Sequence, residues 1–258
     1  NIYKPISETD TTYKKFHDDI KLKNGIEFLV FWNNRNIRRK QPGDVILAFK
    51  KFRDNLPKDK QDTVGLLMHT QIVDNNGTDL RTIHENIAPD CKILFSEARI
   101  SSVELNAMYN VADVTINIAS NEGWGLSSTE SLLSGTPIIN NVTGGLQDQC
   151  RFEDADGNWL RFNGEFSTNH KGMQGSPKTP YIFDDRCQYE EVSDAIAAWY
   201  FTPAEDREEC GEAGREFCLS HGLTSKQMGN KMIEMIDFLF DYPKDKKPKY
   251  TLNKVEST

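Results

Sequence analysis

The sequence predicts an α/β protein: a Rossmann-like, doubly wound parallel sheet with helices on both faces. The main observation is a regular alternation between Glu27 and Asn140, where five short apolar runs are separated by segments of helical periodicity. Strands that alternate with helices at this spacing are joined by right-handed crossovers and form a parallel sheet. A second observation is that polar, glycine-containing motifs follow these runs, at the edge where such sheets bind ligands.

The apolar runs are expected to be strands because they are short and rich in branched and aromatic residues. They occupy residues 27–32, 64–68, 92–95, 114–118 and 136–139. The segments that follow the first four runs are expected to form helices near residues 44–53, 78–87, 102–111 and 127–134. The expected buried positions are Val45, Ile46, Phe49 and Phe52 in the first helix, and Val103, Leu105, Met108 and Tyr109 in the third.

The alternation stops after Asn140. Residues 151–187 are rich in Gly, Asn, Asp and Pro, which predicts an inserted irregular segment. Three amphipathic helices are expected to close the chain, near residues 189–201, 203–219 and 225–240. The expected organisation is a lead-in over 1–24, one domain over 25–240 that carries the insertion, and a basic flexible tail over 241–258.

Composition excludes several classes of protein. The formal net charge is −8, with 39 acidic and 31 basic residues, which argues against wrapping of nucleic acid or adhesion to an anionic membrane. No stretch reaches the roughly 20 apolar residues of a transmembrane helix, and the first residues do not resemble a signal peptide. The five cysteines are odd in number and form no C-x-x-C pair. They indicate reduced thiols, no metal site and a cytoplasmic location.

Two carboxylates, Glu122 and Glu130, are separated by seven residues across a predicted strand–loop–helix junction. Gly123 and Gly125 between them allow the backbone to approach a ligand and to expose its N–H groups. The following helix adds the positive end of its dipole, and ionised carboxylates accept several hydrogen bonds from hydroxyl groups. An alternative is that Glu130 completes a capping box with Ser127, three residues before it. The alternative for Glu122 is, likewise, a solvated loop acid.

Four cations follow the first predicted strand: Arg35, Arg38, Arg39 and Lys40. At the ligand-binding edge of a parallel sheet they can hold a diphosphate. The alternative is a solvated basic loop, which is the usual reading of a charge run. A third motif, residues 143–148, begins Thr-Gly-Gly just after the fifth strand, where paired glycines allow either close backbone approach or a plain turn.

Together these motifs resemble the C-terminal domain of GT-B-fold retaining glycosyltransferases, in particular family four and its glycogen-synthase-like relatives. The run VADVTINIASNEGWGLSSTESLLSGTPIINNVTGG carries the E-x7-E pair and is similar to that family's signature. RNIRRK resembles its Arg-x4-Lys clamp, TGGLQD its following loop, and TPAEDREECGEAGREF its closing helical region. The opening NIYKPIS resembles the segment after the interdomain hinge, so residues 1–24 are expected to be a remnant of that hinge and its lead-in. The resemblance covers about residues 1–150 and 189–240, whereas 151–187 departs from the pattern.

The resemblance implies a donor site for a nucleoside-diphosphate sugar. In it Glu130 would hold the ribose hydroxyls, and Glu122 would bind the donor sugar and place its anomeric carbon. Arg35 and Lys40 would stabilise the diphosphate in place of a metal, with Arg39 as an alternative to Arg35. The base would rest against backbone near Phe95 and Ser96. The remaining donor-binding positions implied are Gly123, Trp124, Gly125 and Leu126, whose backbone lines the sugar and phosphates, and Gly144 in the following loop.

The resemblance also implies a missing N-terminal domain that holds the acceptor, which can be a sugar, a lipid or a protein. We therefore expect the chain to be internal to a longer protein, to bind the donor, and to transfer little alone. The rival interpretations are a GT-B-type sugar-nucleotide epimerase or phosphorylase, and a non-catalytic nucleotide-binding module. A dinucleotide oxidoreductase is disfavoured because no G-x-G-x-x-G follows the first strand. The sequence leaves the donor base, the sugar, the acceptor and the linkage open.

Overall fold

Five parallel strands form the centre of the molecule, in a computed structural model that describes residues 2–150, 178–241 and four short strands between them. The strand order is β3-β2-β1-β4-β5, and the two-residue strand β8 adds in parallel to β5 at the edge. The bounds are β1 (Phe28–Asn33), β2 (Val64–His69), β3 (Lys92–Ser96), β4 (Val114–Asn117), β5 (Ile138–Asn141) and β8 (Glu165–Phe166). The predicted doubly wound parallel sheet is confirmed; β8 was not predicted.

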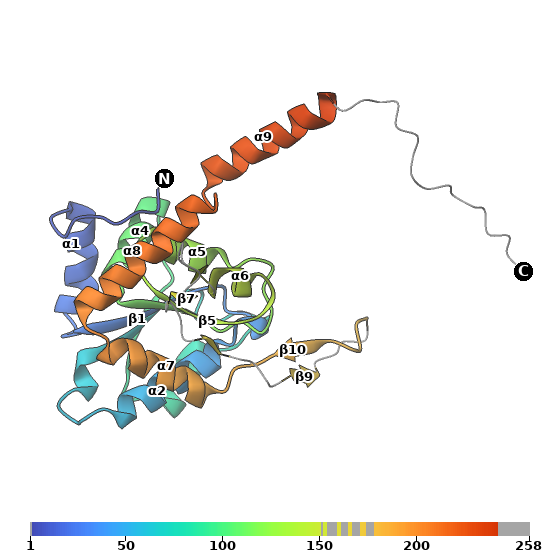
Figure 1. The fold of residues 1–258 in the computed structure, drawn as a ribbon. Coiled ribbons are helices and arrows are strands. Elements are labelled where there is room, and N and C mark those ends of the chain that lie inside the picture. Colours follow the sequence, from blue (N-terminus) through green and yellow to red (C-terminus); the bar gives the residue numbers. More distant parts are fainter. Residues whose placement is uncertain are drawn as a thin grey trace, which may run out of the picture.

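Helices cover both faces of this sheet, as Figure 1 shows. In chain order they are α1 (Thr11–His17), α2 (Pro42–Asn55), α3 (Leu80–Ile87), α4 (Ser102–Val111), α5 (Leu126–Leu133), α6 (Gln147–Cys150), α7 (Tyr189–Phe201), α8 (Ala204–Ser220) and α9 (Ser225–Asp241). Helix α2 packs against α7 and α3, whereas α4 packs against α1 and α5, and α5 also packs against α8. The sheet is therefore the middle of three layers.

Alternation along β1 explains why one strand supports two cores. Phe28, Val30 and Trp32 belong to the cluster that contains the buried residues of α2 and α7. Leu29 and Phe31 belong to the other cluster, with residues of α4. All five side chains are at most 3% exposed, as expected for a central parallel strand covered on both faces.

Most of the predicted burial is confirmed. The four predicted positions of α2 are almost fully buried, and Met108 and Tyr109 of α4 are as well. The prediction is wrong for Val103, which is 59% exposed. Leu105 is partly buried against the core, and full burial in α4 begins at Asn106, whereas Ser102 and Val103 at the start of the helix face solvent. The fifth strand was predicted two residues too early, at 136–139.

The lead-in contains regular helical structure. Helix α1 continues into a π-helical turn, η1 (Asp18–Leu22). Asp113 fixes this turn to the sheet and to α8, because its carboxylate accepts from Lys21 Nζ at 2.6 Å and from Arg207 Nη2 at 3.2 Å. The same carboxylate accepts from the backbone N–H of Leu29 at 2.7 Å. The assignment of residues 1–24 to a hinge remnant stays a prediction.

Two short antiparallel pairs lie in the predicted insertion: β6 (Phe152–Glu153) with β7 (Trp159–Leu160), and β9 (Lys171–Met173) with β10 (Phe183–Asp185). Helix α9 extends away from the three layers in Figure 1 and has no buried residue. The predicted tail lies outside the described residues from 242 onward. No helix within the described ranges is long and apolar enough to cross a membrane.

Helix α8 packs against the turn after α5 through glycine. A Cβ at Gly211 would lie 1.8 Å from the carbonyl oxygen of Gly135. We expect Gly211→Ala to lower the free energy of unfolding by about 1–3 kcal/mol, since the clash is with backbone and outweighs the gain in helix propensity. Gly229→Ala, in exposed α9 with nothing near its Cβ, is the control and should cause no loss. Urea titrations of both variants measure this; equal shifts would contradict the packing role.

Candidate functional site

The direction of the strand order reverses between β1 and β4. Strands β1, β2 and β3 run outward on one side, and β4 and β5 on the other. The chain leaves β1 toward α2 on one face, and it leaves β4 toward α5 on the other. In an open parallel sheet such a reversal leaves a crevice at the carboxyl ends of the two strands. The predicted motifs after β1 and β4 meet at this crevice.

A cavity of about 460 Å³ lies there. It is lined by residues from the end of β1, the loop after β4 and the first turns of α5. The lining residues are Asn33, Asn34, Lys40, Glu122, Gly123, Trp124, Gly125, Leu126, Ser127 and Glu130. Both carboxylates of the E-x7-E pair therefore open onto one space.

Glu122 is held by two cations from the loop after β1. Lys40 Nζ lies 2.9 Å from Glu122 Oε2, and Arg39 Nη1 donates to the same oxygen. Burial acts to raise the pKa of Glu122, but hydrogen bonds and charge from Lys40 and Arg39 outweigh it, so the net pKa is lowered. Burial lowers the pKa of Lys40, and its pairing with Glu122 offsets this only in part. Glu122 is therefore ionised and already paired before any ligand binds.

Glu130 lies at the other side of the same cavity and has tyrosine partners. The hydroxyl of Tyr109 donates to Glu130 Oε2 at 2.9 Å and accepts from Asn33 Nδ2 at 2.8 Å. Tyr3 also hydrogen-bonds Glu130. Burial raises the pKa of Glu130, and the hydrogen bonds from Tyr109 and Tyr3 lower it only in part. The capping-box interpretation of Glu130 is wrong, because α5 begins at Leu126 after Gly125 and has no side-chain cap.

Glycines shape the loop that enters α5. Gly125 has a φ of 91°, and a Cβ there would lie 2.3 Å from Leu146 Cδ2. Gly123 has nothing within 4 Å of its Cβ position, so its backbone borders open space. The indole Nε1 of Trp124 donates to Thr129 Oγ1 at 2.8 Å and fixes the loop to the helix. The first turn of α5 thus presents its N-terminus to the cavity, which favours anionic groups.

The Thr-Gly-Gly motif supports Glu122 from behind and does not line the cavity. The backbone N–H of Gly145 donates to the carbonyl of Glu122 at 2.9 Å. A Cβ at Gly144, whose φ is 49°, would lie 2.2 Å from that same carbonyl oxygen. The two glycines are therefore required because two loops approach each other closely. The sequence alone left two alternatives open here, close backbone approach and a plain turn.

A second cavity of about 340 Å³ adjoins the first, since both are lined by Asn33 and Asn34. Arg35 lines it, with Nε 2.9 Å from Asp74 Oδ2. Ser96 lines it as well, with Oγ 3.0 Å from Nδ1 of His69. Burial lowers the pKa of His69, partly offset by a hydrogen bond that its ring donates to the backbone of Ser96. The two cavities form one groove along the ends of β4, β1, β2 and β3.

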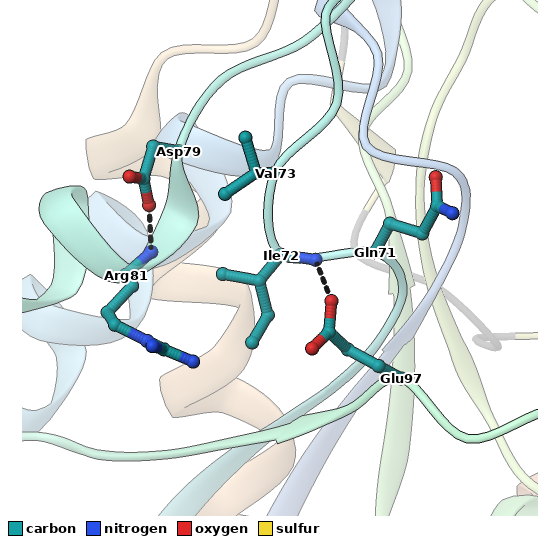
Figure 2. Close-up of a pocket in the computed structure, with 6 residues that line it drawn as sticks. All are labelled: Gln71, Ile72, Val73, Asp79, Arg81 and Glu97. Atoms are coloured by element: carbon teal, nitrogen blue, oxygen red, sulfur yellow. Dashed lines mark hydrogen bonds between the residues drawn. The ribbon is translucent and has the colours of Figure 1, made fainter.

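A third, smaller cavity of about 230 Å³ continues the groove, because it shares Gln71 and Glu97 with the second. Figure 2 shows its lining residues, with the Glu97 carboxylate accepting from the backbone N–H of Ile72 at 2.9 Å. This bond ties the loop after β2 to the end of β3. Asp79 caps α3 on the far side by accepting from the N–H of Arg81 at 3.0 Å.

The predicted site residues separate into three positions. Lys40, Glu122, Gly123, Trp124, Gly125, Leu126 and Glu130 line the first cavity, and Arg35 and Ser96 line the second. Arg39 and Gly144 line neither of these two cavities and instead contact Glu122. Asn33, Asn34 and Tyr109 were missed as site residues; polar residues directly after a buried strand are the signal that could have found the two asparagines. Within the described ranges, no three His, Cys, Asp or Glu side chains are placed to hold a metal ion.

Comparison with known proteins identifies relatives of part of the chain. A trehalose synthase from Pyrococcus horikoshii is 31% identical over 111 residues, which are 41% of this chain and 26% of that protein. The matched part thus spans about a quarter of this curated relative. No protein-family model matches the chain.

Solved structures show the fold. Sucrose-phosphate synthase from Thermosynechococcus elongatus matches with a TM-score of 0.63 at 17% identity, over 93% of this chain and 50% of that one. HepE from Anabaena, solved with UDP-glucose, has a TM-score of 0.64 at 13% identity, over 92% and 54%. The C-terminal domain of a group 1 glycosyl transferase from Francisella tularensis has a TM-score of 0.59 at 12% identity, over 85% and 95%. The resemblance to GT-B glycosyltransferases is confirmed at the level of fold.

The raised pKa of Glu130 predicts a dependence of stability on pH. Its folded-state pKa lies above the ordinary value of 4.5, so the folded state binds more protons than the unfolded state between the two values. The free energy of unfolding of the wild type, minus that of Glu130→Gln, should therefore fall as pH rises above about 4.5. Denaturant titrations between pH 4 and 8 measure this difference.

Glu104→Gln is the control for that experiment. Hydrogen bonds from Ser101 lower the pKa of Glu104 below its ordinary value of 4.5. The free energy of unfolding of the wild type, minus that of Glu104→Gln, should therefore rise with pH, and this rise should occur below about pH 4.5. If the difference between wild type and Glu130→Gln is flat or rises with pH, burial is not the dominant influence on the pKa of Glu130.

Proposed function

We propose that this chain is the donor-binding half of a retaining glycosyltransferase and binds a nucleoside-diphosphate sugar. The observation that carries the proposal is one cavity at the strand-order reversal that contains Glu122, Glu130, Lys40 and the N-terminus of α5. Carboxylates suit the hydroxyls of a sugar and a ribose, and a cation beside a helix N-terminus suits phosphate. The sequence match to a trehalose synthase and the fold likeness to HepE, solved with UDP-glucose, support the same class of ligand.

The groove offers separate places for the parts of such a donor. Glu122, with Gly123 to Leu126, borders the space proposed for the sugar. Glu130, fixed by Tyr109 and Tyr3, accepts the ribose hydroxyls. The base extends into the second cavity, beside Ser96. Lys40 in the first cavity and Arg35 in the second flank the junction, where the diphosphate lies and where leaving-group charge develops.

In this proposal Arg39 holds Glu122 in place, and Arg35 and Lys40 are the diphosphate clamp. Positive side chains then supply the charge stabilisation, so no metal is required for donor binding. The acceptor, a sugar, lipid or protein, is bound by a further domain of the kind that makes up the remaining half of the longer neighbours. The chain alone then transfers little. No observation on the described residues favours the epimerase, the phosphorylase or the non-catalytic module.

The first prediction from this proposal concerns ligand-induced stabilisation. UDP, GDP, ADP and their sugar conjugates are added to the chain in EDTA and, separately, with Mg²⁺. One base should raise the unfolding temperature in both buffers; at 100 times the dissociation constant the stabilisation is about 2.7 kcal/mol. Glu130→Ala should abolish the shift and Glu104→Ala, outside the groove, should keep it. A shift seen only with Mg²⁺, or retained in Glu130→Ala, would contradict the proposal.

A second prediction separates the two arginines. Arg35→Ala should weaken binding of the nucleoside diphosphate about 10- to 100-fold, as for loss of a hydrogen bond to a charged group, and leave the nucleoside unaffected. Arg39→Ala should weaken mainly the sugar conjugate relative to the diphosphate, because it acts through Glu122. Isothermal titration calorimetry with the three ligands measures both ratios. If Arg39→Ala gave the larger loss for the diphosphate itself, the assignment of the clamp would be reversed.

A further inference from the structure

Two polar atoms in the groove have no hydrogen-bond partner among the residues that the structure describes. They are the hydroxyl Oγ1 of Thr70 and the amide Nδ2 of Asn34, and both atoms are shielded from solvent. Thr70 as a whole is only 7% exposed. An enclosed polar group without a partner is destabilising, so such groups are uncommon in native proteins.

Their position distinguishes these two atoms from the other unpartnered ones. The described part of the chain contains four more, on Trp32, Arg53, Asn140 and Asn141, and none of those residues lines one of the three groove cavities. Thr70 lines the second cavity, and Asn34 lines both the first and the second. A group bound in the groove is therefore a candidate partner for both side chains.

Strand register places the two side chains at the junction of the cavities. Asn33 at the end of β1 is paired with His69 at the end of β2, and His69 is paired with Ser96. Asn34 and Thr70 are the next residues along their chains, so they lie at neighbouring strand ends. The backbone N–H of Thr70 donates to the carbonyl of Ser96 at 3.0 Å, and this bond holds Thr70 in position at the edge of the sheet.

The two unpartnered atoms at the junction need a hydrogen-bond acceptor. An amide Nδ2 donates and a hydroxyl can donate, whereas two of the cations that line the cavities already have carboxylate partners. Lys40 is paired with Glu122 and Arg35 with Asp74. The shielded donors at the junction that lack any partner, Asn34 Nδ2 and Thr70 Oγ1, are therefore neutral. Phosphate oxygens accept only, and in a nucleoside-diphosphate sugar the phosphates lie between the two parts that the cavities would hold.

We propose that Asn34 and Thr70 form a phosphate subsite at the junction of the groove and donate hydrogen bonds to the diphosphate of the bound nucleotide. This inference rests on the proposed nucleotide-binding function and adds to it two neutral donors beside the charged clamp. Neutral donors fix the position of the phosphates without having to leave a carboxylate partner first. Arg35 and Lys40 can then turn from Asp74 and Glu122 toward an anion that is already held.

The experiment uses Thr70→Val, which removes the hydroxyl and keeps the shape, and Asn34→Ala. The ligands are the nucleoside and the nucleoside diphosphate of the base preferred in the thermal panel, titrated by calorimetry. We expect each variant to bind the diphosphate about 10-fold or more weakly, as for loss of a hydrogen bond to a charged group. Binding of the nucleoside should stay within about twofold. Thr82→Val is the matched control: its hydroxyl donates to Asp79 outside the second cavity, and it should bind as wild type.

Unfolding of the empty protein provides an independent measurement. Because the Thr70 hydroxyl has no partner in the described structure, Thr70→Val should unfold at the same urea concentration as wild type or a higher one. A lower midpoint would mean that the hydroxyl is already satisfied within the protein, and would overturn the inference. So would equal loss of nucleoside and diphosphate binding, or wild-type binding by both variants. If the wild type binds no nucleotide, the proposed function itself fails.

Discussion

The reversal of strand order between β1 and β4 is the constraint on which the site depends. It sends the chain to opposite faces of the sheet, so that the loops after β1 and β4 separate and leave room for a ligand. The same geometry places Lys40 and Glu122, which are 82 positions apart, at 2.9 Å from one another. Backbone contact reinforces the pairing, because the N–H of Ser120 donates to the carbonyl of Arg39 at 2.7 Å. The topology of the sheet therefore brings the charged groups of the site together.

A polar layer behind the site holds these groups in place. Ser128 of α5 donates to Asn140 of β5 at 2.9 Å, and Ser131 donates to Thr115 of β4 at 2.8 Å. These side chains are almost fully buried, so their hydrogen bonds favour one orientation of the helix over the sheet. Since Glu130 is on the same helix, its carboxylate is positioned by contacts that do not touch the cavity. Residues 143–145 support Glu122 from its other side in the same way.

Hydrophobic periodicity was sufficient to predict the five main strands and the helices between them, because a fully covered sheet requires continuous apolar runs. The E-x7-E spacing likewise placed Glu122 and Glu130 on one site. Side-chain partners that depend on tertiary contact could not be predicted: nothing local links Glu130 to Tyr109, or Arg35 to Asp74. Strand β8 was missed because two residues are too few to show a hydrophobic pattern. Among the four cations after β1, the sequence could not assign directions, since all have the same charge.

The carboxylate of Glu122 beside Lys40 and Arg39 also determines what the empty groove rejects. Free sulfate offers acceptors only, and it would meet an ionised carboxylate next to the cations that should attract it. A ligand that also carries hydroxyl groups can satisfy Glu122 and the cations together. Under the proposed function, this arrangement would favour ligands that carry donors and acceptors on one molecule, with part of the selectivity coming from repulsion.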